Sequence, residues 1–353
     1  MDKLAESKFG VGGLGHVIKN TDWVYENTAP RAIVPFDWDQ GYNVQADLRE
    51  YARYTDSFTI PVKNQGVSFS CGGMAGSYYA EILEAFKTRT FSEKSAKFIY
   101  APIAVPGGGS WGADIMNRIK KNGAAAEMLC RSYEGGNPPS EDFITRKEDI
   151  TQEAITNASF SESVSYSFIY SFDIETLASA IRDNKGIILL IRGANNGTWL
   201  SQYPLPPSPS IPEASIWGHW VYAGRARMID GKKYLGILNS WGESVGDRGW
   251  QYIGEDYVNS GRLELGMTMS FGQPKTYQFT KDLYLGMTDA DVLFLQRILN
   301  RNPLTEVAST GNGSPGKETY FSSFNLDQAS RVYCEAAEVK AVELGAKAKG
   351  TRA

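Results

Sequence analysis

The chain of 353 residues is long enough for one large domain or for two or three smaller ones. Hydrophobic residues make up 42% of it and aromatic residues 12%, so it can bury a substantial core. Its net charge is −4, with both signs spread along the sequence, which gives no electrostatic reason to expect a nucleic-acid partner. The longest apolar run, residues 186–191, is far too short to span a bilayer, so we expect no membrane partner either.

The cysteines Cys71, Cys130 and Cys334 lie far apart and do not form a disulfide framework, which fits a reducing compartment or a protein that does not rely on disulfide bridges. No Cys/His cluster has the spacing of zinc ligands, and no metal site is expected. The N-terminus lacks a basic start followed by an apolar core, so no secretory signal is visible. These features fit a cytoplasmic or virion-associated protein from a virus, a phage or a bacterium, without fixing the location.

The first 31 residues are rich in glycine, and we expect an arm or loop that lies across the surface of the following domain. An extended entry and a short helix are expected over residues 32–53. A buried helix is predicted over 72–86, because Met74, Tyr78 and Ile82 recur at a spacing of four.

Two further helices are predicted before residue 140. One covers residues 92–101, and the other covers 113–121 and ends at Gly123, which is a favourable C-cap. A glycine run, 107–109, precedes the second helix. Such a run lets another chain approach the backbone closely, but it is equally compatible with a flexible turn.

After residue 140 the pattern changes. A helix is predicted over residues 174–183, and short strands follow it. The expected strands are 186–192, 217–227, 233–239, 249–253 and 265–271. Helices first and antiparallel strands afterwards indicate an α+β unit of two lobes with a cleft between them.

Cys71 stands just before the predicted helix 72–86, where the helix dipole favours a thiolate. His219 begins a strand that reverses at a predicted hairpin turn, Asp230–Gly231, and Asn239 ends the returning strand. The hairpin would place imidazole and amide at the same end, where an amide oxygen can orient a histidine base. The alternatives are a buried inert cysteine, a core histidine and a turn asparagine. The other histidine, His16, lies in the glycine-rich arm and is the poorer candidate.

Together these stretches resemble the papain-like (cathepsin-type) cysteine peptidases. PVKNQGVSFSC, residues 61–71, is similar to the family's cysteine motif. GHWVYAGRA, residues 218–226, resembles its histidine strand, and LNSWGESVGDRGW, residues 238–250, its asparagine motif. The resemblance covers residues 34–271 and implies a two-lobed papain-like fold, with a helical lobe and an antiparallel β-barrel-like lobe.

The resemblance also implies roles in hydrolysing a polypeptide substrate without any cofactor or metal. Cys71 would attack the scissile carbonyl, and His219, oriented by Asn239, would exchange the proton. Gln65 and the Cys71 backbone N–H would bind the oxyanion. The substrate-contacting or shielding residues implied are Gly109, Ser110, Trp217 and Trp241.

The chain departs from the family pattern near the nucleophile. Gly72 replaces the aromatic residue that often follows the cysteine, and Phe69 replaces a glycine and is expected to crowd the oxyanion region. Ser68 replaces a disulfide cysteine, and Ser110 replaces a glycine where substrate backbone should lie. The N-terminal arm is shorter than the family's usual inhibitory propeptide.

Residues 286–337 resemble a small helical peptidoglycan-binding-like domain, a type that binds either cell wall or another protein. The expected segments are an arm at 1–31, the papain-like domain at 32–272, a linker at 273–285, a small all-α domain at 286–337 and a flexible tail at 338–353. Three functions are compatible with the sequence. They are a thiol peptidase, an inactive papain-like binding or structural component, and a peptidoglycan endopeptidase.

Overall fold

A computed structural model of the chain describes residues 11–15, 24–25, 35–158, 164–169, 171–194, 199 and 216–271. The chain divides into two compact units, Met1–Asp22 with Phe36–Gln273, and Trp23–Pro35 with Pro274–Ala353. All elements below belong to the first unit. The small all-α domain expected at 286–337 and the tail at 338–353 lie outside the described residues, and so does His16.

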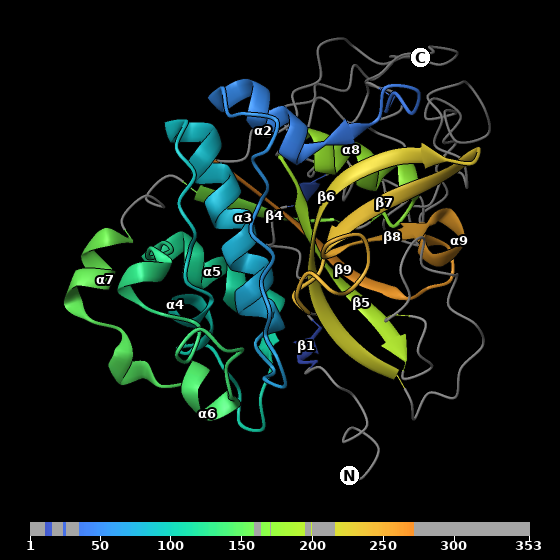
Figure 1. The fold of residues 1–353 in the computed structure, drawn as a ribbon. Coiled ribbons are helices and arrows are strands. Elements are labelled where there is room, and N and C mark those ends of the chain that lie inside the picture. Colours follow the sequence, from blue (N-terminus) through green and yellow to red (C-terminus); the bar gives the residue numbers. More distant parts are fainter. Residues whose placement is uncertain are drawn as a thin grey trace, which may run out of the picture. The chain divides into compact units, whose positions relative to one another are not determined.

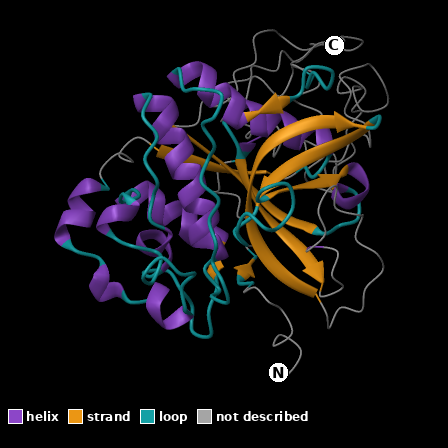
Figure 2. Cartoon of the chain, in the orientation of Figure 1, coloured by secondary structure: helices purple, strands orange, loops and turns teal. Residues whose placement is uncertain are grey.

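Most helices of the first unit gather on one side of the sheet, whereas α8 and α9 lie among the strands (Figures 1 and 2). The helices are α2 (Val44–Ala52), α3 (Cys71–Thr88), α4 (Ala96–Tyr100), α5 (Gly112–Asn122), α6 (Glu141–Ile144), α7 (Gln152–Asn157), α8 (Ile174–Asp183) and α9 (Glu255–Val258). The strands are β1 (Gly13–Leu14), β2 (Tyr42–Asn43), β3 (Ser110–Trp111), β4 (Val164–Ile169), β5 (Ile187–Ala194), β6 (Ile216–Ile229), β7 (Lys232–Leu238), β8 (Trp250–Gly254) and β9 (Leu263–Phe271).

The main sheet of the described part has the order β4-β9-β5-β6-β7-β8, and β2 pairs with β6 outside this path. All of these pairs are antiparallel. The β6–β7 hairpin turns at Asp230 and Gly231, whose φ angles of 48° and 74° fit the tight turn that Asp-Gly favours. The predicted α+β class and the five predicted strands are confirmed. Strand β4 was not predicted.

Helix α3 packs between α4, α5 and the sheet, and it is buried on nearly every side rather than on one face. The close approach depends on small residues, because a Cβ at Gly73 would lie 2.6 Å from the Tyr100 Cβ. Helix α4 begins later than predicted, at Ala96, because the Ser95 hydroxyl accepts from the Phe98 N–H and caps it there.

A buried ion pair joins α3 to the loop before it. Lys63 Nζ lies 2.9 Å from Glu81 Oε2, and both side chains are almost completely buried. The hydroxyl of Tyr78, one turn earlier on α3, accepts from the Lys63 N–H and donates to the Asn239 carbonyl 3.3 Å away. These contacts tie the middle of α3 to the segment after β7, where Asn239 lies.

Candidate active site

The predicted catalytic residues come from helix α3, strand β6, and the loops that precede α3 and follow β7. Cys71 is the first residue of α3, His219 lies on β6, and Asn239 directly follows β7. The hairpin register pairs Tyr222 with Leu238, which brings His219 and Asn239 to the same end. His219 Nε2 and Asn239 Oδ1 are 2.8 Å apart, and both residues are fully buried.

The hydrogen bonds around Asn239 define the protonation of the imidazole. Asn239 Oδ1 also accepts from the Ser240 N–H at 2.7 Å, so the oxygen end of the amide faces His219. Nε2 must therefore carry the hydrogen, and Nδ1 keeps its lone pair. This Nδ1 is buried and has no hydrogen-bond partner in the described part of the chain. The neutral imidazole therefore carries its hydrogen on Nε2 and can accept a proton at Nδ1.

The Cys71 thiol is enclosed by backbone. Burial raises its pKa to about 11, and hydrogen bonds with the backbone of Trp220, Gly12 and Gly72 partly offset this rise. Burial also lowers the pKa of His219 to about 4, against the opposing effect of its bond to Asn239. Near neutral pH, thiol and imidazole are therefore both uncharged in this state.

Gln65 is fixed in orientation by the segment that follows Asn239. The Ser240 hydroxyl donates to Gln65 Oε1 at 2.6 Å, and Gln65 Nε2 donates to the Ser68 carbonyl at 2.8 Å. Its amide nitrogen therefore faces the loop that leads into Cys71. An oxyanion donor is needed on this side of the nucleophile. Ser240 was not singled out from the sequence, although it lies next to Asn239.

Residues 11–15, which belong to the predicted N-terminal arm, lie between the nucleophile segment and the histidine strand instead of crossing the surface. β1 (Gly13–Leu14) pairs in parallel with β3, and the Ser110 N–H donates to the Gly12 carbonyl at 3.0 Å. A Cβ at Gly12 would lie 2.4 Å from the Phe69 carbonyl oxygen, and one at Gly13 would lie 2.8 Å from the backbone nitrogen of His219. Only glycines fit between the nucleophile segment and the histidine strand in this way.

Two departures from the family pattern compensate each other. A Cβ at Gly72 would lie 2.2 Å from the Ser110 hydroxyl oxygen and 2.7 Å from Ile115 Cδ1. The Ser110 side chain therefore points toward Gly72 and occupies the room that an aromatic residue there would need. The Ser110 hydroxyl is buried without a hydrogen-bond partner among the described residues.

Phe69 packs against the glycine run. Gly107, Gly108 and Gly109 all have φ angles near +90°, which residues with a side chain rarely adopt. A Cβ at Gly108 would lie 2.3 Å from the Phe69 ring, so the ring covers this turn. The Phe69 N–H donates to Glu141 Oε2 at 2.7 Å.

Glu141 is a structural link that the sequence did not indicate. Its other oxygen accepts from the Tyr100 hydroxyl at 2.7 Å, and this hydroxyl accepts from the Gly109 N–H at 2.8 Å. One carboxylate therefore connects the loop before Cys71 with the segment that pairs with the arm. Its charge also raises the pKa of Cys71.

Two tryptophans predicted near the site flank the histidine. The Trp241 ring is stacked on His219, with centroids 4.8 Å apart and an interplanar angle of 27°. Trp217 meets His219 edge to face at 6.0 Å. Both tryptophans are buried against the imidazole.

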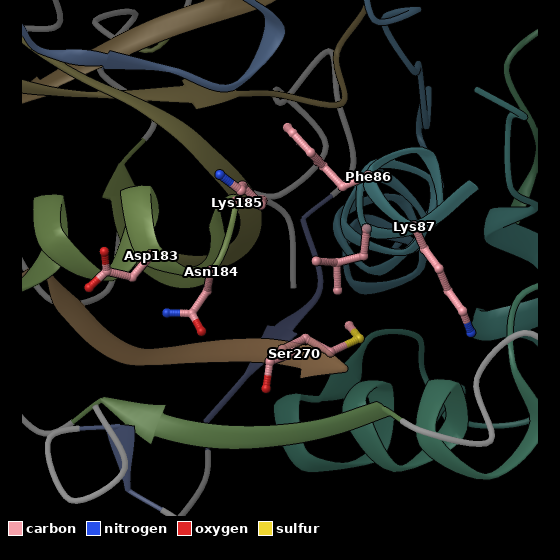
Figure 3. A pocket seen from close by; sticks show the side chains of 8 residues that line it. Phe86, Lys87, Asp183, Asn184, Lys185 and Ser270 are labelled. Carbon is pink, nitrogen blue, oxygen red and sulfur yellow. The ribbon is translucent and has the colours of Figure 1, made fainter. Parts of the chain in front are cut away.

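A separate pocket of about 350 Å³ lies at the other end of α3 (Figure 3). It is lined by Leu83, Phe86, Lys87, Asp183, Asn184, Lys185, Met269 and Ser270. None of the predicted catalytic side chains reaches it. Within the described residues, no group of three His, Cys, Asp or Glu residues could hold a metal ion. No described helix has both the length and the apolar character required to cross a membrane.

No protein-family model matches the sequence, and the comparison with curated proteins found no match. Solved structures do match. Xylellain, a cysteine protease from Xylella fastidiosa, aligns with a TM-score of 0.58 and 17% identity over 77% of this chain and 97% of its own. proCathepsin B S9 from Trypanosoma congolense aligns with a TM-score of 0.55 and 13% identity over 78% of this chain and 90% of its own. The ragweed pollen allergen Amb a 11, a cysteine protease in its proform, aligns with a TM-score of 0.51 and 16% identity over 67% of this chain and 66% of its own. Identities this low show the fold alone, and the chain has the fold of papain-like cysteine proteases.

Proposed function

We propose that the protein is a thiol peptidase that hydrolyses peptide bonds through an acyl-enzyme. One observation carries the proposal. The imidazole of His219 is held through Nε2 by Asn239, while its basic Nδ1 is left without a partner among the described residues, next to the segment that contacts the Cys71 thiol. A thiol, an oriented base and a fixed amide donor are the groups that acyl transfer requires.

The proposed reaction begins when the Cys71 proton passes to His219 Nδ1 and the sulfur attacks the scissile carbonyl carbon. The carbonyl oxygen gains negative charge, which Gln65 Nε2 and the Cys71 backbone N–H stabilise. His219 then gives its proton to the leaving amine, and a thioester remains on Cys71. A water molecule, deprotonated by His219, hydrolyses the thioester and restores the thiol.

The arm sets the resting state in this proposal. Residues 11–15 fill the space that a substrate backbone needs beside Ser110, and they keep the thiol and the imidazole out of water. When the arm leaves, water can reach both groups, so the pKa of Cys71 falls and that of His219 rises. The charged thiolate–imidazolium pair then becomes accessible, and catalysis begins.

The competing proposal is an inactive papain-like binding component. The occupied cleft and the uncharged Cys71 and His219 favour it. The peptidoglycan endopeptidase alternative has weaker support, because it rests on residues 286–337, outside the described part of the chain. The domain boundaries at 272 and 286 are likewise still predictions.

A thiol-directed epoxysuccinyl probe separates an enzyme from a binding component. The full chain is incubated with the probe, and the labelled cysteine is identified by mass spectrometry. A peptidase is expected to be labelled at Cys71, to lose this label in His219→Ala, and to cleave unfolded casein. Cys130, which is buried and free, is an internal control that should stay unlabelled. Absence of label and of cleavage, even when the arm is displaced by substitution of Gly12, would support the binding component.

A further inference from the structure

The hydrogen-bond chain that orients His219 continues beyond Asn239. Asn239 Nδ2 donates to Gln251 Oε1 at 2.6 Å, and Gln251 Nε2 donates to the Trp199 carbonyl at 2.6 Å. We propose that Gln251 is a positioning residue for the reaction proposed above, because it holds Asn239 and thereby selects the tautomer of His219.

The argument rests on the direction of each hydrogen bond. A backbone carbonyl can only accept, so the Trp199 carbonyl turns the Gln251 amide until Nε2 faces it. Gln251 Oε1 then faces Asn239. This oxygen is an acceptor, so the Asn239 group that faces it must be the donor Nδ2. The Asn239 oxygen is left for His219, and His219 must present an N–H through Nε2. The polarity of one peptide carbonyl is thus transmitted through two amides to the imidazole.

Burial prevents the two amides in this chain of hydrogen bonds from reversing their orientation. Gln251 and Asn239 are both fully buried, so neither amide can exchange its partners with water. If either amide were reversed, two like groups would face each other in the interior, and an unsatisfied buried polar group is costly. Gln251 lies within the otherwise largely apolar strand β8, where its polar side chain would be unfavourable without these two bonds.

The backbone holds Gln251 in register with Asn239. Gln251 pairs with Ile237 on β7, and the Asn239 N–H donates to the Gly249 carbonyl at 2.9 Å. The Trp199 ring packs edge to face against Trp217 and Tyr257, which fixes the carbonyl at the far end of the chain of bonds. The rings and strands therefore place all three partners independently of any substrate.

The test reads the tautomer directly and does not depend on peptidase activity. The full chain has two histidines, His16 and His219, so selective ¹⁵N-histidine labelling gives two imidazole spectra, which His16→Gln assigns. In the wild type, His219 is expected as the Nε2–H tautomer near neutral pH. In Gln251→Met the preference for this tautomer should fall by about threefold to tenfold, the equivalent of one lost hydrogen bond.

Three variants distinguish positioning from general packing. Gln251→Glu, in its protonated form, keeps an acceptor toward Asn239 and a donor toward the Trp199 carbonyl, and should retain the Nε2–H tautomer. In an Asn239→Ala background, Gln251→Met should have no additional effect, because its action passes through Asn239. Gln45→Met is the matched control. Gln45 is also buried, and its side chain accepts a hydrogen bond of 3.1 Å from the Ile60 N–H, outside the candidate site.

An unchanged His219 spectrum in folded Gln251→Met would overturn the proposal, because Ser240 would then suffice to hold Asn239. So would a tautomer shift of equal size in Gln45→Met. If the spectra behave as expected but no peptide is cleaved and Cys71 takes no probe, the peptidase assignment fails and the positioning role of Gln251 stands.

Discussion

The placement of Gly12 gives a sharp prediction about access to Cys71. In Gly12→Ala the new Cβ would lie 2.4 Å from the Phe69 carbonyl oxygen and 2.8 Å from the Gly109 Cα. Both are backbone atoms, so neither can rotate out of the way. The φ angle of Gly12 is not in the left-handed region, so the substitution crowds the cleft without straining its own backbone.

The crowding around the new Cβ sets the expected increase in the alkylation rate of Cys71. Adding a methyl group to a tightly packed site costs about 1–3 kcal/mol, and here the cost falls only on the state in which the arm is docked. This range corresponds to an increase of about 5- to 150-fold in the population with the arm undocked. If Cys71 reacts only when the arm is away, its alkylation rate rises by the same factor.

Iodoacetamide alkylation of Cys71, followed by peptide mass spectrometry, measures this rate. Gly15→Ala is the matched control, because its Cβ would crowd only the Glu264 carboxylate, at 2.3 Å, and would make an ordinary contact with Leu190 Cδ2 at 4.0 Å. The Glu264 side chain is 37% exposed and can move at the expense of its ion pair with Arg192, at most about 1 kcal/mol. Equal alkylation rates in folded Gly12→Ala and wild type would refute the idea that the arm limits access.

Three more predictions concern charged groups. Lys63→Met should lower the free energy of unfolding by about 3–5 kcal/mol, since it leaves Glu81 buried without its cation, whereas the double variant Lys63→Met/Glu81→Leu should recover most of the loss in chemical denaturation. The pKa of His219 falls from 6.5 to about 4 on folding, so the unfolded chain binds an extra proton between these values, and stability is lost as pH drops through this window. The loss is roughly 3 kcal/mol relative to His219→Gln, and parallel pH profiles of the two proteins would contradict it. Glu141→Gln should lower the pKa of the Cys71 thiol, because it removes a nearby negative charge, and ultraviolet titration of the thiolate would detect the change or show that there is none.

The parts of the fold that follow local rules were predictable. Helix α8 covers the predicted residues 174–183, and the hairpin reverses at the predicted Asp230–Gly231 pair. Both depend on short-range signals, namely an N-cap, an apolar face and a turn dipeptide. β4 was missed because its alternation of serine with tyrosine and phenylalanine does not separate a strand from a loop until β9 pairs with it.

The site was predictable in its residue types but not in its surroundings. Cys71, His219 and Asn239 stand in recognisable motifs, and the structure brings His219 and Asn239 into hydrogen-bond contact. The arm in the cleft could not be predicted, because a glycine-rich segment has no apolar pattern that indicates where it docks. Gln251 left one signal, a polar residue inside an apolar strand, but its partner Trp199 is 52 residues away in sequence.

The large sequence separations between residues of the site also affect how the chain folds during synthesis. The Ser240–Gln65 hydrogen bond joins residues 175 positions apart, and the Tyr78–Asn239 bond joins residues 161 apart. Contacts this distant form late, since the chain must close long loops before they are gained. During synthesis, the thiol of Cys71 emerges from the ribosome well before the imidazole and amides that would activate it. A growing chain therefore carries an unactivated cysteine until β8 has emerged, and by then residues 11–15, which precede Cys71 in the chain, are already available to dock.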